Sequence, residues 1–152
     1  MKLPKGIYSL NSLKDNQQKT IILVHPTLNS HNSRYLKNIN DVIENHEGPI
    51  ITLDGVNTFD STYSEFQRKC PGKERYFIKT LSSGPVPVEM DSNKMYEFLI
   101  SFPSRPIGLG GVFSSGCVRV VLNNLFFRNV DAKLIKGLSY NGFNEIFGDK
   151  YL

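Results

Sequence analysis

The sequence has few of the features that mark small secreted proteins or membrane proteins. It contains only two cysteines in 152 residues, Cys70 and Cys117, which lie far apart. A secreted scaffold of small size would show several cysteines at spacings that suggest disulfide pairs. The first residues lack the apolar stretch of a signal peptide, and no apolar run reaches the length of a membrane span. We therefore expect a soluble, cytoplasmic protein with reduced thiols and no membrane partner.

The sequence also lacks a cluster of basic residues. It has 18 Lys and Arg against 14 Asp and Glu, a formal net charge of +4, but the basic residues are scattered from Lys2 to Lys150. Proteins that bind nucleic acids usually gather such residues in a patch or carry a readable motif. We therefore expect no nucleic-acid partner and a small-molecule substrate or ligand instead.

Metal and cofactor motifs are missing as well. His25, His31 and His46 do not have the spacing of metal ligands, either with one another or with the cysteines. Residues 108–111 supply only two glycines of a dinucleotide-binding motif, and no glycine-rich phosphate loop is present. The sequence therefore predicts no metal site and no cofactor.

What the chain does contain is an alternation of short apolar strands and amphipathic helices. This pattern predicts a single α/β domain over residues 1–152, a three-layer sandwich with a mainly parallel, Rossmann-like sheet. The tail from Tyr140 onward is predicted to add a short covering helix. The expected strands are 20–24, 50–53, 75–79, 106–110 and 132–135, and the expected helices are 29–46, 61–68, 92–102 and 118–126.

Polar residues follow several of the predicted strands. Ligands of open α/β sheets bind beyond the carboxyl ends of the strands. Those ends hold His25, Asp54, Lys79 and the segment 113–117. We expect these residues to lie at one edge of the sheet.

Cys117 has the strongest chemical case among them, because it stands at the predicted start of a helix. The helix dipole and the free N–H groups of the first turn favour a thiolate and could hold an oxyanion. The turn before it supplies Phe113, Ser114 and Gly116 as candidates for oxyanion and substrate binding. The alternative is a small cysteine that packs the first helical turn.

The other strand-end residues have roles that depend on Cys117. His25 could take the proton of the thiol, or else bond to a nearby carbonyl as a capping residue. Lys79 could stabilise negative charge near the sulfur, or else point to solvent. Asp54 is a candidate for substrate binding, although Asp-Gly is also a common turn pair.

The sequence resembles the isochorismatase-like cysteine hydrolases, a family that includes nicotinamidases and related amidases. The resemblance is carried by Leu109-Gly110-Gly111-Val112, then four residues, then Cys117-Val118, and by the strand that ends in Lys79. It covers the chain from about Thr20 to Tyr140. It implies an α/β fold, a nucleophilic role for Cys117 and a supporting role for Lys79.

The chain departs from this family at two places. The family's first strand ends in an aspartate that serves as general base, whereas this strand ends in His25. The histidine that binds metal in nicotinamidases would fall near Val56, which cannot be a ligand. The resemblance therefore leaves two functions open: hydrolysis of a C–N or related bond with His25 as the base, or a non-catalytic binding or regulatory role on the same fold.

A shorter similarity connects residues 115–119, Ser-Gly-Cys-Val-Arg, with the cysteine motif of L,D-transpeptidases. That family is secreted and rich in β-structure, and it has a histidine shortly before the cysteine motif. This sequence has neither an export signal nor such a histidine.

The exposed helices of the expected fold would also allow a homo-oligomer.

Overall fold

Five parallel strands form the central sheet, in the order β3-β2-β1-β4-β5. The computed structural model describes residues 19–142 and 145–146. All residues of β1, β2 and β4 are buried, which explains why these segments are apolar without alternation. The strands are β1 (Ile21–Val24), β2 (Ile50–Gly55), β3 (Arg75–Thr80), β4 (Ile107–Val112) and β5 (Ala132–Tyr140).

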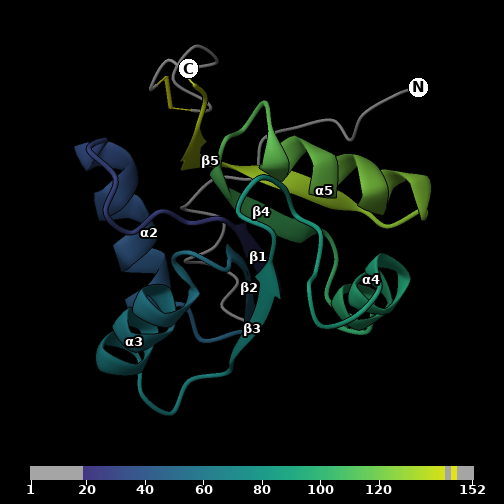
Figure 1. Ribbon diagram of the computed structural model, residues 1–152, viewed down its shortest axis with the longest axis horizontal. Coiled ribbons are helices and arrows are strands. Elements are labelled where there is room, and N and C mark those ends of the chain that lie inside the picture. Colours follow the sequence, from purple (N-terminus) through teal and green to yellow (C-terminus); the bar gives the residue numbers. More distant parts are fainter. Residues whose placement is uncertain (1–18, 143–144, 147–152) are drawn as a thin grey trace.

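Two pairs of helices cover the two faces of the sheet (Figure 1). Helices α2 (Ser33–Asn45) and α3 (Phe59–Lys69) pack on one face, and α4 (Ser92–Ile100) and α5 (Cys117–Phe127) pack on the other. Side-chain caps are present at two helix starts. The side chain of Asn32 accepts a hydrogen bond from the Tyr35 N–H at 3.1 Å, and Asp91 accepts one from the Lys94 N–H at 2.8 Å.

The chain order reverses between β1 and β4. The chain runs outward from β1 through β2 to β3, crosses back to β4 and then runs outward to β5. Because the connections on the two sides use opposite faces, the loops after β1 and β4 diverge at this switch point. The predicted α/β class with a parallel sheet is confirmed, and the site residues were expected at the carboxyl edge of the sheet near this point.

The end of the chain differs from the prediction. The fifth strand was expected over 132–135 but continues to Tyr140. Gly137, with φ +86°, lies in a register shift that lets β5 resume pairing with β4 at Ser139. The predicted tail helix is wrong at Tyr140, which ends β5, and at Ile146, which forms an antiparallel bridge with Tyr140. Phe143 and Phe147 lie outside the described residues.

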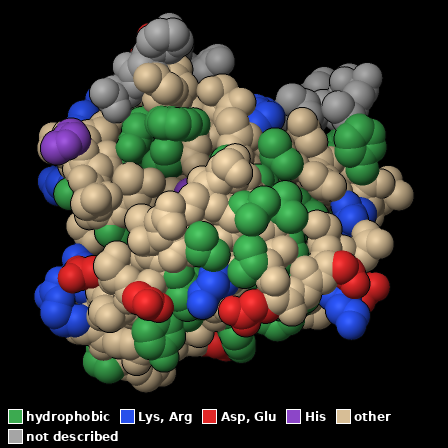
Figure 2. Space-filling model, in the orientation of Figure 1, with side chains coloured by type: hydrophobic (Ala, Val, Ile, Leu, Met, Phe, Trp, Pro, Cys, Tyr) green, Lys and Arg blue, Asp and Glu red, His purple; other side chains and the backbone are tan. Residues whose placement is uncertain are grey.

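Charged side chains do not segregate on the surface of the face drawn in Figure 2, where basic and acidic groups lie beside one another. Ion pairs on the protein surface include Lys73 with Glu47, at 2.9 Å, and Lys79 with Glu89, at 3.5 Å. Within the described part of the chain, no helix is long and apolar enough to span a bilayer.

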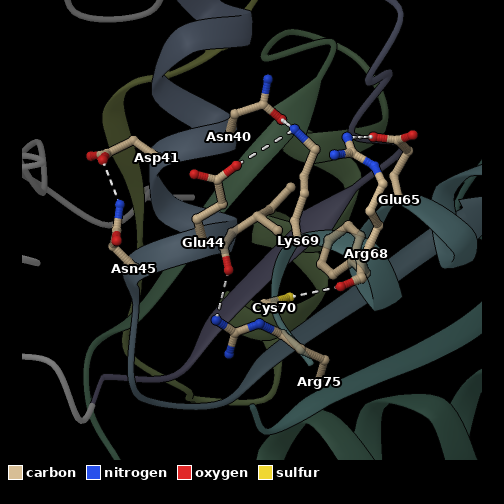
Figure 3. Close-up of polar contacts among 11 residues, drawn as sticks. Asn40, Asp41, Glu44, Asn45, Glu65, Arg68, Lys69, Cys70 and Arg75 are labelled. Atoms are coloured by element: carbon tan, nitrogen blue, oxygen red, sulfur yellow. Dashed lines mark hydrogen bonds and ion pairs between the residues drawn. The ribbon is translucent and has the colours of Figure 1, made fainter. Parts of the chain in front are cut away.

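Arg75 fastens the start of β3 to the end of α2 (Figure 3). Its guanidinium donates hydrogen bonds to the carbonyl oxygens of Ile43 at 2.9 Å, His46 at 2.6 Å and Gly48 at 2.9 Å. These carbonyls lie where a helix leaves its last acceptors without partners. One side chain therefore caps α2 and fixes the connection that leads into β2.

Replacing Arg75 should destabilise the fold. Arg75→Met removes the charged donor from three carbonyls, and we expect the free energy of unfolding to fall by about 2–3 kcal/mol. Urea denaturation followed by circular dichroism measures the change. Arg68→Met is the control, since Arg68 is exposed and its ion pair with Glu65 lies on the surface, so its denaturation midpoint should stay nearly constant. Equal midpoints for the two variants would contradict this role for Arg75.

Candidate active site

The turn between β4 and α5 is held by backbone hydrogen bonds, and it presents Cys117 at the first position of the helix. The Ser114 N–H donates to the Tyr140 carbonyl at 2.9 Å, which fastens the turn to the end of β5. The N–H groups of Gly116 and Val118 both donate to the Phe113 carbonyl, at 2.9 and 3.3 Å. The peptide bond between Val112 and Phe113 is cis. The location predicted for Cys117, after a strand and at a helix start, is confirmed.

The three candidate residues of this turn have different surroundings. Ser114 is buried, and its N–H is already bonded to β5. The Phe113 ring is 43% exposed and packs edge-on against Tyr140, with ring centroids 5.8 Å apart. Gly116 is the N-cap of α5, and no side chain caps this helix. The N-terminal amides of α5 are therefore not covered by a capping side chain, as an oxyanion site requires.

Cys117 is partly buried and packs against the core on the α4 and α5 side of the sheet. Burial raises the pKa of its thiol, and a hydrogen bond with its own backbone N–H opposes that effect in part. The thiol is therefore protonated at neutral pH. A reaction at this sulfur needs a base to remove the proton during attack.

His25 ends the neighbouring strand and turns away from it, with φ +45°. Its backbone N–H donates to the Leu53 carbonyl at 2.7 Å, and Nε2 of its ring lies 2.8 Å from Oγ1 of Thr80. The Thr80 hydroxyl donates its only proton to the Leu81 carbonyl at 2.9 Å, so its oxygen accepts from Nε2–H. This network assigns the proton to Nε2 and leaves the lone pair on Nδ1.

The protonation state of His25 follows from its burial. Burial lowers the pKa of its imidazole below 6.5, and the Asp54 carboxylate opposes this effect. The ring is therefore neutral at pH 7 and able to accept a proton. Thr80, which sequence reasoning missed, fixes the ring; its position directly after the Lys79 strand was the available signal.

Asp54 is not a turn residue, as the Asp-Gly pair suggested, but the fifth residue of β2. It is only 2% exposed, and Oδ2 accepts a hydrogen bond from the Thr58 hydroxyl at 3.1 Å. The carboxylate is buried because β2 is covered on both faces at this level. Asp54 therefore influences His25 through its charge from inside the protein.

Lys79 does reach the carboxyl edge of the sheet, paired in register with Asp54. Its ammonium lies 3.5 Å from Glu89 and 5.0 Å from the centroid of the Phe59 ring. The side chain neither points freely into solvent nor contacts Cys117 through a hydrogen bond among the described residues. Its contact with Phe59 directs it toward α3.

The strand ends thus bring the predicted residues to one edge, but they do so in two groups. Cys117, Phe113, Ser114 and Gly116 belong to the turn after β4, while His25, Asp54 and Lys79 follow β1, β2 and β3. The backbone N–H and the ring of His25 bond to Leu53 and Thr80, its carbonyl accepts from Thr27, and no hydrogen bond among the described residues joins it to Cys117. The catalytic roles of these residues remain predictions. No cluster of three or more His, Cys, Asp or Glu suited to a metal occurs among the described residues.

Comparison with known proteins finds similarity in structure but not in sequence. No family model matches the chain, and no curated protein matches it in sequence. Among solved structures, the N-carbamoylsarcosine amidase from Thermoplasma acidophilum is similar, with a TM-score of 0.54 and 11% sequence identity. The match covers 81% of this chain and 84% of that chain. At this identity the likeness concerns the fold alone, and it supports the α/β architecture with a parallel sheet that the sequence predicted.

Gly111 lets β1 and β4 approach each other at the carboxyl edge of the sheet. It has φ +116°, and a Cβ built at this position would lie 1.9 Å from the Val24 carbonyl oxygen. No side chain fits there without separating β1 from β4. The distance between the His25 and Cys117 segments therefore depends on this glycine.

The variant Gly111→Ala should unfold more easily than the wild type, by about 3 kcal/mol or more, because a methyl group would overlap the backbone of β1. Thermal unfolding by calorimetry provides the measurement. Gly84→Ala is the matched control, since a Cβ at Gly84 meets nothing within 4 Å. A Gly111→Ala protein as stable as Gly84→Ala would show that β1 and β4 are not held at this separation.

Proposed function

We propose that the protein is a cysteine hydrolase of the isochorismatase-like type, which cleaves a C–N or related bond in a small molecule through a thioester. The observation that carries this proposal is the position of Cys117, partly exposed at the uncapped start of α5, directly after the turn that follows β4, the strand paired with β1. The likeness in fold to an N-carbamoylsarcosine amidase supports the same reaction type.

His25 acts as the base in this proposal. It belongs to the strand adjacent to β4, its imidazole is neutral at pH 7, and Nδ1 has the free lone pair. Nδ1 removes the thiol proton of Cys117 while the sulfur attacks the carbonyl carbon of the substrate, and a C–S bond forms. Such a step needs movement of the His25 ring or a water between the two groups.

The remaining steps return the enzyme to its starting state. The negative charge on the substrate oxygen is stabilised by the amide of Cys117 at the α5 N-terminus, with the turn amide of Phe113 as the second candidate donor. The C–N bond breaks, and the imidazolium gives its proton to the leaving nitrogen. Water then attacks the thioester, passes a proton to Nδ1 and releases the acid, and the sulfur regains its proton from His25.

Lys79 and Asp54 support this reaction at a distance. Lys79 adds positive charge beyond the ends of β2 and β3, shared with Glu89. Asp54 is buried, and its charge stabilises the imidazolium that His25 becomes during attack. Both are positioning and electrostatic residues in this scheme, not groups that touch the reacting atoms.

A non-catalytic binding protein is the second candidate, and one observation favours it. Burial raises the pKa of Cys117, whereas a nucleophilic cysteine is commonly activated by a lowered pKa. The same scaffold would then bind a small ligand at the carboxyl edge of the sheet without forming a covalent bond.

An activity assay separates the two candidates. Ammonia release from N-carbamoylsarcosine and from simple primary amides should occur with the wild type and should fall roughly 1,000-fold in kcat/KM with Cys117→Ser. Cys70→Ser is the matched control, because Cys70 is buried and its thiol donates to the Phe66 carbonyl at the end of α3, away from the turn before α5. Equal rates for the two serine variants would refute a nucleophilic role for Cys117; no turnover of any tested substrate would favour the binding protein.

Alkylation kinetics test the pairing of His25 with Cys117. Labelling of Cys117 by iodoacetamide, followed by intact mass between pH 5 and pH 10, should be at least about tenfold slower at pH 7 in His25→Ala than in wild type, because the base is lost. The difference in labelling rate between wild type and His25→Ala should disappear as the pH falls below 6.5 and His25 becomes protonated. His31→Ala, at an exposed position, is the control. Identical profiles for both histidine variants would rule out the pair.

A further inference from the structure

A cavity of about 360 Å³ lies at the carboxyl edge of the sheet, between the loop after β1 and one side of α3. This volume is within the range of sites for small molecules. Its wall does not include Cys117, His25 or Lys79. The cavity is lined by Thr27, Leu28, Asn29, Thr58, Ser61, Thr62 and Glu65.

The wall contributed by α3 is polar along its whole length. Positions 58, 61, 62 and 65 recur at helical spacing and so share one side of the helix. These four residues carry three hydroxyl groups and one carboxylate. Apolar residues could equally have occupied a helix side that faces a loop. The lining, drawn from the described residues, includes one apolar side chain, Leu28, and no Lys or Arg.

Three of the hydroxyl groups have already donated their protons to the protein. Thr27 donates to the His25 carbonyl at 2.9 Å, Thr58 to the Asp54 carboxylate at 3.1 Å, and Ser61 to the Thr58 carbonyl at 3.0 Å. Each hydroxyl oxygen keeps a lone pair that can accept a hydrogen bond. The cavity therefore offers mainly acceptors.

Thr62 and Glu65 are the other two residues of α3 that line the cavity. Thr62 is only 4% exposed, and no hydrogen bond of its hydroxyl to a described residue is found, although it lines the cavity. The Thr62 oxygen is not among the buried side-chain atoms that lack a partner, so it meets solvent at the cavity, where a ligand group can take the place of water. Glu65 is ionised, since its hydrogen bond with Arg68 lowers the pKa of its carboxyl, and it adds negative charge to the lining.

From this arrangement we infer that the cavity is a second binding site, for a small polyhydroxylated molecule that is rich in O–H or N–H donors and carries no acid group, such as a neutral sugar or an amino sugar. The buried carboxylate of Asp54 behind Thr58 and the carboxylate of Glu65 both repel an anion. The site is independent of the proposed hydrolysis, because Cys117 packs against the core on the opposite face of the sheet.

Three probes with the same pyranose ring test the inference: glucosamine, glucose and glucuronate. Titration of the isotopically labelled protein, followed by amide chemical shifts, should show saturable changes at residues 27–29 and 58–65 with glucosamine and glucose. Glucuronate should bind at least about tenfold more weakly, because the carboxylates of Asp54 and Glu65 repel its carboxylate. Absence of saturable shifts with all three sugars, shifts confined to other residues, or equal binding of glucuronate would each overturn the inference.

Matched variants locate the site. Ser61→Ala and Thr62→Val each remove a hydroxyl from the lining and should weaken glucose binding roughly fivefold. Ser64→Ala removes an exposed hydroxyl from α3 outside the lining and should leave affinity unchanged. Glu65→Gln should abolish any preference for glucosamine over glucose. Affinity that is the same in Ser61→Ala, Thr62→Val and Ser64→Ala would place binding elsewhere.

One further variant separates this site from the proposed reaction. Cys117→Ser should bind glucose as the wild type does, while it loses any hydrolytic activity. Loss of sugar binding in Cys117→Ser would show that the two sites are one, and would overturn the independence inferred here. Loss of activity alone concerns the hydrolase proposal and leaves the cavity unaffected.

Discussion

The close contact between β4 and β1 at Gly111 is the constraint on which the site depends. The glycine backbone leaves no room for a side chain beside the Val24 carbonyl, so the two central strands pair as far as their carboxyl ends. At that level the chain leaves β1 at His25 and leaves β4 into the turn before Cys117. A wider separation of the two strands would move these two segments apart.

The chain passes from one face of the sheet to the other at the same place, so the candidate functional residues are distributed between the two faces. Cys117 starts a helix on the α4 and α5 face, whereas the loop after β1 leads toward α2 and α3 on the other. His25 stands where the two meet: its ring reaches Thr80 past the end of β2, and its carbonyl receives the Thr27 hydroxyl from the wall of the cavity. One loop therefore connects the candidate base to the polar cavity.

Burial sets the resting charges in this region. It raises the pKa of Cys117 and lowers that of His25, so both groups are neutral at pH 7. A neutral thiol and a neutral imidazole do not form an ion pair in advance, so in the proposed hydrolysis proton transfer would have to accompany attack. The buried carboxylate of Asp54 favours that transfer, because it stabilises the imidazolium that results.

The sequence by itself determined the alternation of strands and helices, the parallel class of the sheet and the place of Cys117 at a helix start, because hydrophobic periodicity and capping residues such as Asn32 and Asp91 are local signals. It could not determine that β5 continues to Tyr140, since the register shift at Gly137 is defined only by pairing with β4. Nor could it determine the partners of the strand-end residues. Thr80 for His25, Thr58 for Asp54, and Glu89 with Phe59 for Lys79 are contacts between segments whose distance is set by packing. Tertiary structure alone decided these contacts, because hydrogen bonds and burial depend on which chain segments meet in space.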